Sequence, residues 1–369
     1  MRLCASESST IAGWIQRGPM RERIRAFTRA FRRRNGWHKI GVAIGLVIVA
    51  FALTTLFRLL RDIDIDKVVV ALRLTSPYQI LVAGGFVAAS YVTLTFYDYF
   101  SLRTIGRRDV PYRVAALASF ISYTIGHNLG ATVFTAGAIR FRIYSAWGLC
   151  IADVVKIAFV TGLTFWLGNA FVLGAGLLWE PEAASAITQL PPWINRAIAL
   201  TGLAIIAGYL LWLMLGPRTV GRGGWRVTLP CARLTLVQIG IGVLDLTAGA
   251  LAMHALLPAD PSIDFVTVQV IFVTAALLGF LSHAPGSLGV FEAAMLVALP
   301  QFQKEELLAS LLIFRVLYFM LPFCAAVLLL RRPVAYRLKP HYCSLVRVGR
   351  FYGCAVTRSG QKNAAYTAR

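Results

Sequence analysis

Long apolar stretches dominate the chain and alternate with short polar loops. Seven of them hold about 17 to 25 residues with at most one charged side chain each, close to the roughly 20 residues that a helix needs to cross a bilayer. They span residues 41–60, 80–100, 154–178, 194–215, 234–257, 265–281 and 307–330. This pattern predicts an all-α polytopic membrane protein.

Two apolar segments are interrupted by residues that break helices. The first interruption contains Gly126, His127, Asn128 and Gly130, and the second contains Pro285, Gly286 and Gly289. Interrupted membrane helices in matching positions of two halves are typical of a transport site near the middle of the bilayer. We therefore expect these breaks to mark the tips of two re-entrant helical hairpins.

Loop charges predict the path of the chain. By the positive-inside rule, both basic tails are cytoplasmic, whereas the acidic loops near residues 180 and 260 are external. With these ends fixed, segments 111–153 and 265–300 must each return to the side on which they began. The prediction is six full spans plus two oppositely oriented hairpins, arranged as an inverted repeat of residues 80–178 and 229–330. The alternative is eight plain spans with glycine kinks.

Composition supports a membrane protein and explains the net charge of +21. The 369 residues are 58% hydrophobic and 14% charged, whereas soluble domains are about 25% charged. Residues 1–39 hold ten basic and two acidic residues, and residues 331–369 hold nine basic and none acidic. We interpret residues 1–39 as a cytoplasmic arm, 40–332 as the membrane domain and 333–369 as a disordered cytoplasmic tail, and expect no nucleic-acid partner.

Ionisable residues at membrane depth are candidates for a functional site, because their burial is costly. They are Asp245, Glu292, Arg315 and His127. Arg315 could hold a phosphate, while the two carboxylates could receive an ammonium group. The alternative is an ion cluster that only holds the spans together. Asp98, Asp153 and Lys156 lie nearer to predicted helix ends and are expected to be interfacial.

Arg140 and Arg142 alternate with aromatic residues at a predicted cytoplasmic boundary. They suit the entrance for a lipid headgroup, or equally an interfacial anchor. The six cysteines show no C-x-x-C spacing, so we expect no metal site and no disulfide framework. Motifs of soluble hydrolases, metalloproteases and P-loop ATPases are absent from the sequence. We therefore expect a protein that is not an enzyme and needs no cofactor.

Three motifs together resemble a known family. They are SYTIGHNLG at residues 122–130, GAIRFRIYSAWGL at 137–149 and PGSLGVFE at 285–292. Over residues 40–332 the chain is similar to the transmembrane flippase half of the lysylphosphatidylglycerol synthase/flippase family, also called the multiple peptide resistance factor family. In that resemblance, Asp245, Glu292 and Arg315 match a buried polar cluster, and Asn128, Arg140 and Arg142 match a first-hairpin motif.

The resemblance implies a lipid flippase of the bacterial inner membrane that carries aminoacylated phosphatidylglycerol to the outer leaflet and so protects against cationic antimicrobial peptides. The soluble aminoacyltransferase domain of bifunctional members is absent from this chain, which puts the lysyl lipid as substrate in doubt. Two alternatives stay open: a membrane-embedded lipid-modifying transferase, and an accessory subunit of a separately encoded synthase. A homo-oligomer is possible as well.

Overall fold

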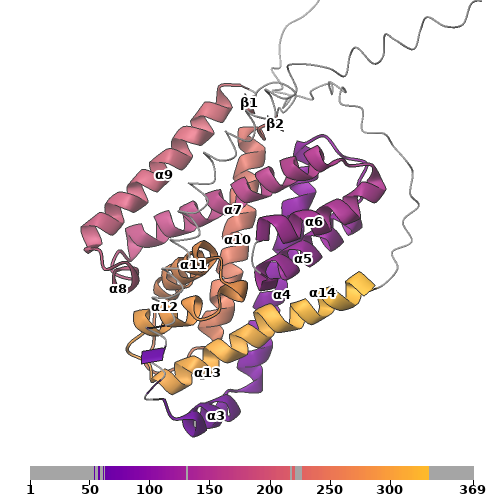
Figure 1. Ribbon diagram of the computed structural model, residues 1–369. Helices are drawn as coiled ribbons and strands as arrows, with labels where there is room; N and C mark the ends of the chain where they lie inside the picture. Colours follow the sequence, from indigo (N-terminus) through magenta and orange to yellow (C-terminus); the bar gives the residue numbers. More distant parts are fainter. Residues whose placement is uncertain are drawn as a thin grey trace, which may run out of the picture.

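The chain folds into a bundle of helices of very different lengths (Figure 1). The computed structural model describes residues 63–129, 132–216, 218–220 and 227–331, with Thr54, Phe57, Arg58 and Arg61 as isolated positions. The α-helices are α3 Ile65–Leu74, α4 Pro77–Thr104, α5 Tyr112–Leu129, α6 Thr132–Tyr144, α7 Ile151–Trp179, α8 Ser185–Thr188, α9 Pro192–Met214, α10 Ala232–Leu256, α11 Phe265–Ser282, α12 Val290–Ala298, α13 Lys304–Arg315 and α14 Leu321–Arg331. The 3-10 helices η1 Ser145–Trp147 and η2 Pro285–Ser287, the π-helix η3 Val316–Met320 and the short antiparallel strands β1 Thr219–Val220 and β2 Val227–Thr228 complete the described elements.

Six helical stretches in the described residues are long and apolar enough to cross a membrane. Five of them, namely α4, α7, α9, α10 and the continuous α13–η3–α14 stretch, correspond to predicted spans. The sixth is α11, which we predicted as the first arm of the second hairpin. The predicted span at 41–60 lies almost wholly outside the described residues, as do the arm at 1–39 and the tail at 333–369. The chain is a multi-pass membrane protein.

Local sequence signals explain where several helices begin. Ser76 and Gln79 form a capping box at the start of α4, and Pro77 occupies the first helical position, where a missing N–H is harmless. Asp264 caps α11 by accepting a hydrogen bond of 2.8 Å from the Val266 backbone N–H. Such caps supply acceptors to backbone N–H groups at the helix starts.

Each predicted hairpin is a pair of helices, α5 with α6 and α11 with α12, whose arms pack against each other. The second break is confirmed: α11 ends at Ser282, Gly286 and Gly289 have φ of 60° and 80°, and α12 begins at Val290. Glycine adopts such left-handed conformations at little cost. Whether the hairpins are re-entrant in the bilayer stays a prediction.

The first break lies at the end of the predicted segment and not at Gly126 or His127. Helix α5 continues through Gly126, His127 and Asn128 to Leu129, and Gly130 lies outside the described residues. The last turn of α5 is stabilised by the Asn128 side-chain amide, which donates a hydrogen bond of 2.8 Å to the Thr124 carbonyl. A single glycine inside a helix costs only about 1 kcal/mol, so packing and this bond can keep Gly126 helical.

Helix α10 lies at the centre of the bundle and packs on α4, α7, α9, α11 and α13 (Figure 1). Its crossing with α7 is unusually close, because Gly242 and Gly168 face each other. A Cβ placed on Gly168 would lie 2.8 Å from the Gly242 Cα. Small residues of this kind let membrane helices approach backbone to backbone, and they fix the position of α10 relative to the hairpins.

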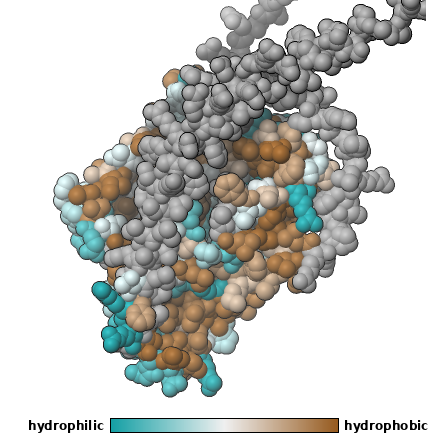
Figure 2. Space-filling view, in the orientation of Figure 1, coloured by the Kyte–Doolittle hydropathy of each residue, from teal (hydrophilic) through white to brown (hydrophobic). Residues whose placement is uncertain are grey.

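The outer surface of the described helices suits a lipid environment. Figure 2 shows broad areas of hydrophobic side chains, with hydrophilic ones gathered mainly toward the edges of the visible surface. Helix α9 illustrates this, since Leu200, Ile205, Leu211 and Met214 are all more than half exposed. Exposed apolar surface on this scale marks contact with lipid or another protein.

Candidate functional site

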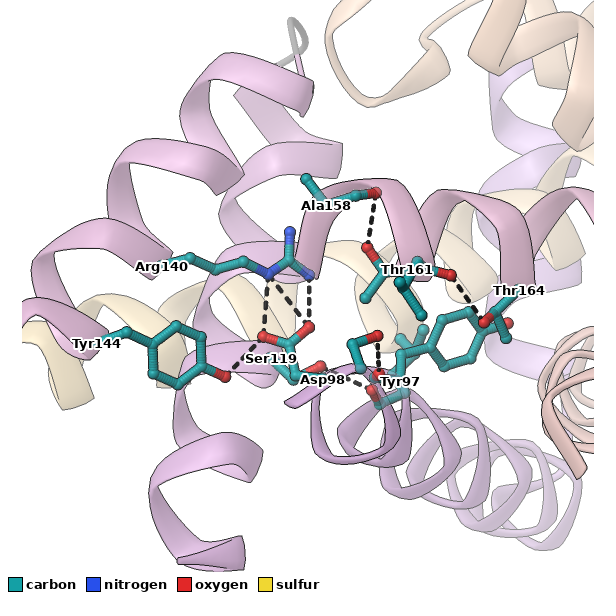
Figure 3. A network of polar contacts seen from close by, with 11 residues as sticks. Tyr97, Asp98, Ser119, Arg140, Tyr144, Ala158, Thr161 and Thr164 are labelled. Carbon is teal, nitrogen blue, oxygen red and sulfur yellow. Dashed lines mark hydrogen bonds and ion pairs between the residues drawn. The ribbon is translucent and has the colours of Figure 1, made fainter. Parts of the chain in front are cut away.

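The first buried charge pair joins α4 to α6. Asp98 has no exposed surface and Arg140 is 4% exposed, and the Arg140 guanidinium donates to both carboxylate oxygens at 2.8 and 2.9 Å. Tyr144 donates a further hydrogen bond of 2.8 Å to the same carboxylate (Figure 3). The Arg140 guanidinium also lies 4.9 Å from the centre of the Tyr123 ring. The charges therefore compensate each other completely within the bundle.

Asp98 was set apart from the candidate site because it lies near a predicted helix end, but it is buried within the bundle. Asp98 lies less than two turns from the end of α4, but α6 folds back over it and supplies a cation from a distant part of the sequence. A signal was present: Ser90, Tyr97 and Ser101 recur with Asp98 on one buried side of α4. By contrast, Asp153 is half-buried near the start of α7 and accepts a hydrogen bond from the Cys150 backbone.

The second buried pair lies at the second hairpin break. Arg315, the last residue of α13, donates through Nε to Glu292. Its two terminal nitrogens donate to the carbonyls of Gly286 and Ser287 at 2.8 and 3.4 Å. The other Glu292 oxygen accepts from the Gly289 backbone at 2.8 Å. Glu292 therefore caps its own helix and holds Arg315 at the same time.

The ends of the two hairpins meet at Arg315. A Cβ on Gly286 would lie 3.6 Å from an Arg315 terminal nitrogen and 4.0 Å from the Asn128 carbonyl oxygen. The Asn128 side chain also donates to the Phe319 carbonyl at 3.4 Å, and the Arg315 guanidinium lies 5.3 Å from the Phe319 ring centre. The end of α5, the turn η2 and the π-helix η3 thus converge on one guanidinium.

Asp245 does not join this pair, although we predicted one cluster of Asp245, Glu292 and Arg315. It faces α4 and accepts a hydrogen bond of 2.6 Å from Ser90, with Tyr97 at 3.5 Å. Asp245 makes no ion pair in the part of the chain that the structure describes. The prediction failed because the N-terminus of α12 orients Glu292 toward Arg315, whereas the Asp245 side chain projects from α10 toward α4.

The remaining predicted residues are His127 and Arg142. His127 is half-buried, with its ring 5.7 Å from that of Tyr123. Arg142 is exposed, so only one of the two arginines in the predicted headgroup entrance is free to meet a ligand. Within the described ranges, no three His, Cys, Asp or Glu residues lie together as a metal site would require.

A wide apolar groove lies on the described part of the bundle, between α4, α5 and the last span. Its volume is about 730 Å³, and α4, α5, η3 and α14 form its walls. Tyr112 and Arg113, in the first turn of α5, contribute polar groups at the edge. The other lining residues are Gly84, Val87, Ala88, Tyr91, Val92, Thr95, Ala116, Leu117, Phe120, Leu317, Leu321, Pro322, Ala325 and Leu329. The groove is therefore suited to hydrocarbon rather than to a polar solute.

Comparison with known proteins gives homologues at low identity. The inner membrane protein YbhN of Escherichia coli is 26% identical over 297 residues, which are 78% of this chain and 87% of YbhN. Phosphatidylglycerol lysyltransferase of Staphylococcus aureus is 23% identical over 302 residues, and these are 79% of this chain but only 33% of that protein. The latter similarity agrees with the family resemblance of the hairpin motifs. No family model matches the chain.

The protein slr0712 of Synechocystis sp. is more similar in sequence than either of these. It is 30% identical over 251 residues, which cover 67% of this chain and 77% of slr0712. An alignment of this length extends well beyond a single motif. The chain therefore belongs to the protein family that contains slr0712.

Proposed function

We propose that this protein moves a phospholipid between the leaflets of the bacterial inner membrane. The observation that carries the proposal is the apolar groove, because two of its walls, α5 and η3, are also elements that meet at Arg315. Its volume of about 730 Å³ falls within the roughly 300–1,000 Å³ of ligand sites. A lipid in the groove would therefore contact two elements that also take part in the hairpin contact.

The chemistry of the groove matches the parts of a phospholipid. The apolar wall suits acyl chains. A phosphate can bind to arginines of the α5–α6 hairpin, namely Arg113, which lines the groove, and the exposed Arg142. Arg315 uses one hydrogen of each terminal nitrogen for a backbone carbonyl, which leaves two N–H groups for a headgroup that reaches the hairpin ends. These carbonyl bonds hold the second hairpin to the last span, so movement of that hairpin relative to the span would require them to exchange.

We further propose that the lipid is aminoacylated phosphatidylglycerol or a related phospholipid. Two observations support this lipid: the similarity to the S. aureus protein named phosphatidylglycerol lysyltransferase, and the resemblance of the three sequence motifs. In this proposal the chain performs no covalent chemistry, both termini face the cytoplasm, and export of the cationic lipid lowers the negative surface charge that attracts antimicrobial peptides.

Leaflet-resolved lipid analysis of cells tests the proposal. Deletion cells and cells complemented with the wild type or with Glu292→Gln are labelled with an impermeant amine-reactive probe, and total lipids are measured in parallel. We expect deletion and Glu292→Gln to lower the labelled aminolipid at unchanged total. Asp109→Asn, which alters an exposed ion pair with Arg107, is the matched control and should behave as wild type. Normal labelling in the deletion strain would refute the proposal.

A second candidate follows from the name of the S. aureus relative, which is that of an enzyme. The chain could modify a lipid headgroup or assist a separately encoded synthase. In the same experiment, either role predicts a changed total amount of aminolipid. A deletion that alters the total and leaves the labelled fraction constant would favour this candidate over lipid movement.

A further inference from the structure

Asp245 differs from the other two buried acids of the bundle. Asp98 and Glu292 each hold an arginine, whereas Asp245 is 7% exposed and has no cationic partner among the described residues. Its oxygens face hydroxyl groups instead, with Ser90 at 2.6 Å and Tyr97 at 3.5 Å. Burying an uncompensated carboxylate is costly, and protonation removes that cost.

The helices around α10 offer no other charge to compensate Asp245. Helix α11 has no titratable side chain, and α7 and α9 carry charged residues only near their first turns. The titratable groups near Asp245, in contact with it or with one of its neighbours, are four tyrosines: Tyr91, Tyr97, Tyr123 and Tyr318. Farther away are two arginines: Arg140 on the other side of Tyr123, and Arg315 at the end of α13. Both arginines are already paired, so the immediate shell consists of hydroxyl groups.

Two buried polar side chains of α10 without partners lie on the same side of the helix as Asp245. Thr235 and Gln238 are at most 1% exposed, and the Thr235 hydroxyl and both amide atoms of Gln238 have no hydrogen-bond partner among the described residues. Thr235, Gln238 and Asp245 are spaced by three and seven residues and share one side of the helix, over about 15 Å. Buried polar groups of this kind are commonly satisfied by water, and water conducts protons. Thr235 lies in the first turn of α10, on the predicted cytoplasmic side.

We propose that Asp245 binds and releases a proton and that its protonation couples lipid movement to the proton gradient. The coupling to lipid movement rests on the proposed function, whereas the proton site does not. A proton fits better than a metal cation, because one carboxylate and a few hydroxyls give too few oxygen ligands for a bound ion.

The bonding around Ser90 connects this proton to the hairpin contact. The Ser90 hydroxyl lies 2.6 Å from Asp245 and 3.2 Å from the Tyr318 hydroxyl, and Tyr91 donates to the Tyr318 carbonyl at 2.9 Å. A proton on the carboxylate oxygen that faces Ser90 turns that oxygen into a donor, and Ser90 then accepts from Asp245 and donates to Tyr318. Tyr318 belongs to η3, which follows Arg315 directly. π-Helical turns of this kind are frequent at functional sites.

Infrared titration of the purified protein tests the proton site without requiring transport. Because the chain holds 16 Asp and Glu residues, the test uses the difference between the spectra of wild type and Asp245→Asn. That difference should contain the C=O stretching band of a protonated carboxylic acid, and the band should grow as pH falls. The same difference for Asp109→Asn, at an exposed acid, is the control and reports an ordinary surface carboxylate. A difference spectrum for Asp245→Asn that contains no titrating band would overturn the inference.

Coupling is measured in vesicles of phosphatidylethanolamine and phosphatidylglycerol that contain a fluorescent phosphatidylglycerol. A gradient of one pH unit is worth about 1.4 kcal/mol, so it should speed wild-type transfer by up to about tenfold and have no effect in Asp245→Asn. Equal acceleration of both proteins, or acceleration by a sodium gradient alone, would contradict coupling through this proton. If wild type transfers no lipid at all, the proposed function fails while the infrared titration still decides the proton site.

Discussion

The Asp98–Arg140 pair allows the energetic role of a buried charge to be separated from its role in transport. Asp98→Asn removes the negative charge and leaves Arg140, 4% exposed, without its counter-ion. Breaking a buried pair from one side costs about 3–5 kcal/mol. Replacing both partners with apolar residues of similar volume, as in Asp98→Leu with Arg140→Met, is close to neutral because no charge remains buried.

The assay is unfolding of the purified protein by sodium dodecyl sulfate in mixed micelles, followed by circular dichroism. We expect each single variant to lose about 3–5 kcal/mol and the double variant to recover most of it. Asp109→Asn, in the partly exposed pair with Arg107, should lose far less. Losses that simply add in the double variant would refute the reasoning. If the stable double variant also fails to move lipid, the pair has a role beyond stability.

Three further predictions concern packing, the groove and pH. Gly242→Val should destabilise the bundle by about 1–3 kcal/mol, because its Cβ would lie 2.9 Å from the α7 backbone, whereas Gly240→Val has open space and should cost much less in the same assay. Ala116→Trp should fill the groove and slow lipid transfer in vesicles, while Leu200→Trp on the exposed side of α9 should not. Partial burial favours the neutral form of Asp109, but the hydrogen bonds and charge of its arginine partner outweigh this and lower its pKa. The stabilisation it gives should therefore be present near neutral pH and be lost as pH falls through the lowered pKa, and Asp109→Asn should remove that part of the pH dependence of the melting temperature.

Hydrophobic periodicity and loop charge were sufficient to predict most of the helices and the second hairpin break. The segment around Pro285, Gly286 and Gly289 carries its own breaking signal, so the turn follows from local backbone preferences. The first break could not be placed as well, because Gly126 and Asn128 favour a turn only weakly and the contacts of α5 with η2 and η3 keep the helix intact.

The sequence did not predict which residues pair with the buried charges. Asp98 lies 42 residues from Arg140, and nothing in the spacing says that α6 returns to the C-terminal part of α4. For Glu292 and Arg315 the sequence identified both residues but not the Gly289 backbone N–H or the carbonyls that complete the arrangement. Asp245 was assigned to the same cluster because side-chain direction on α10 depends on how the helices pack.

The most direct measurement of the central claim is transbilayer movement of a fluorescent phosphatidylglycerol in vesicles containing only this protein, read as the fraction protected from an impermeant quencher. We predict that wild type moves the lipid well above protein-free vesicles, and that Glu292→Gln, which neutralises the partner of Arg315 at the hairpin contact, returns the rate toward the protein-free value. Movement by wild type no faster than in protein-free vesicles would contradict the account.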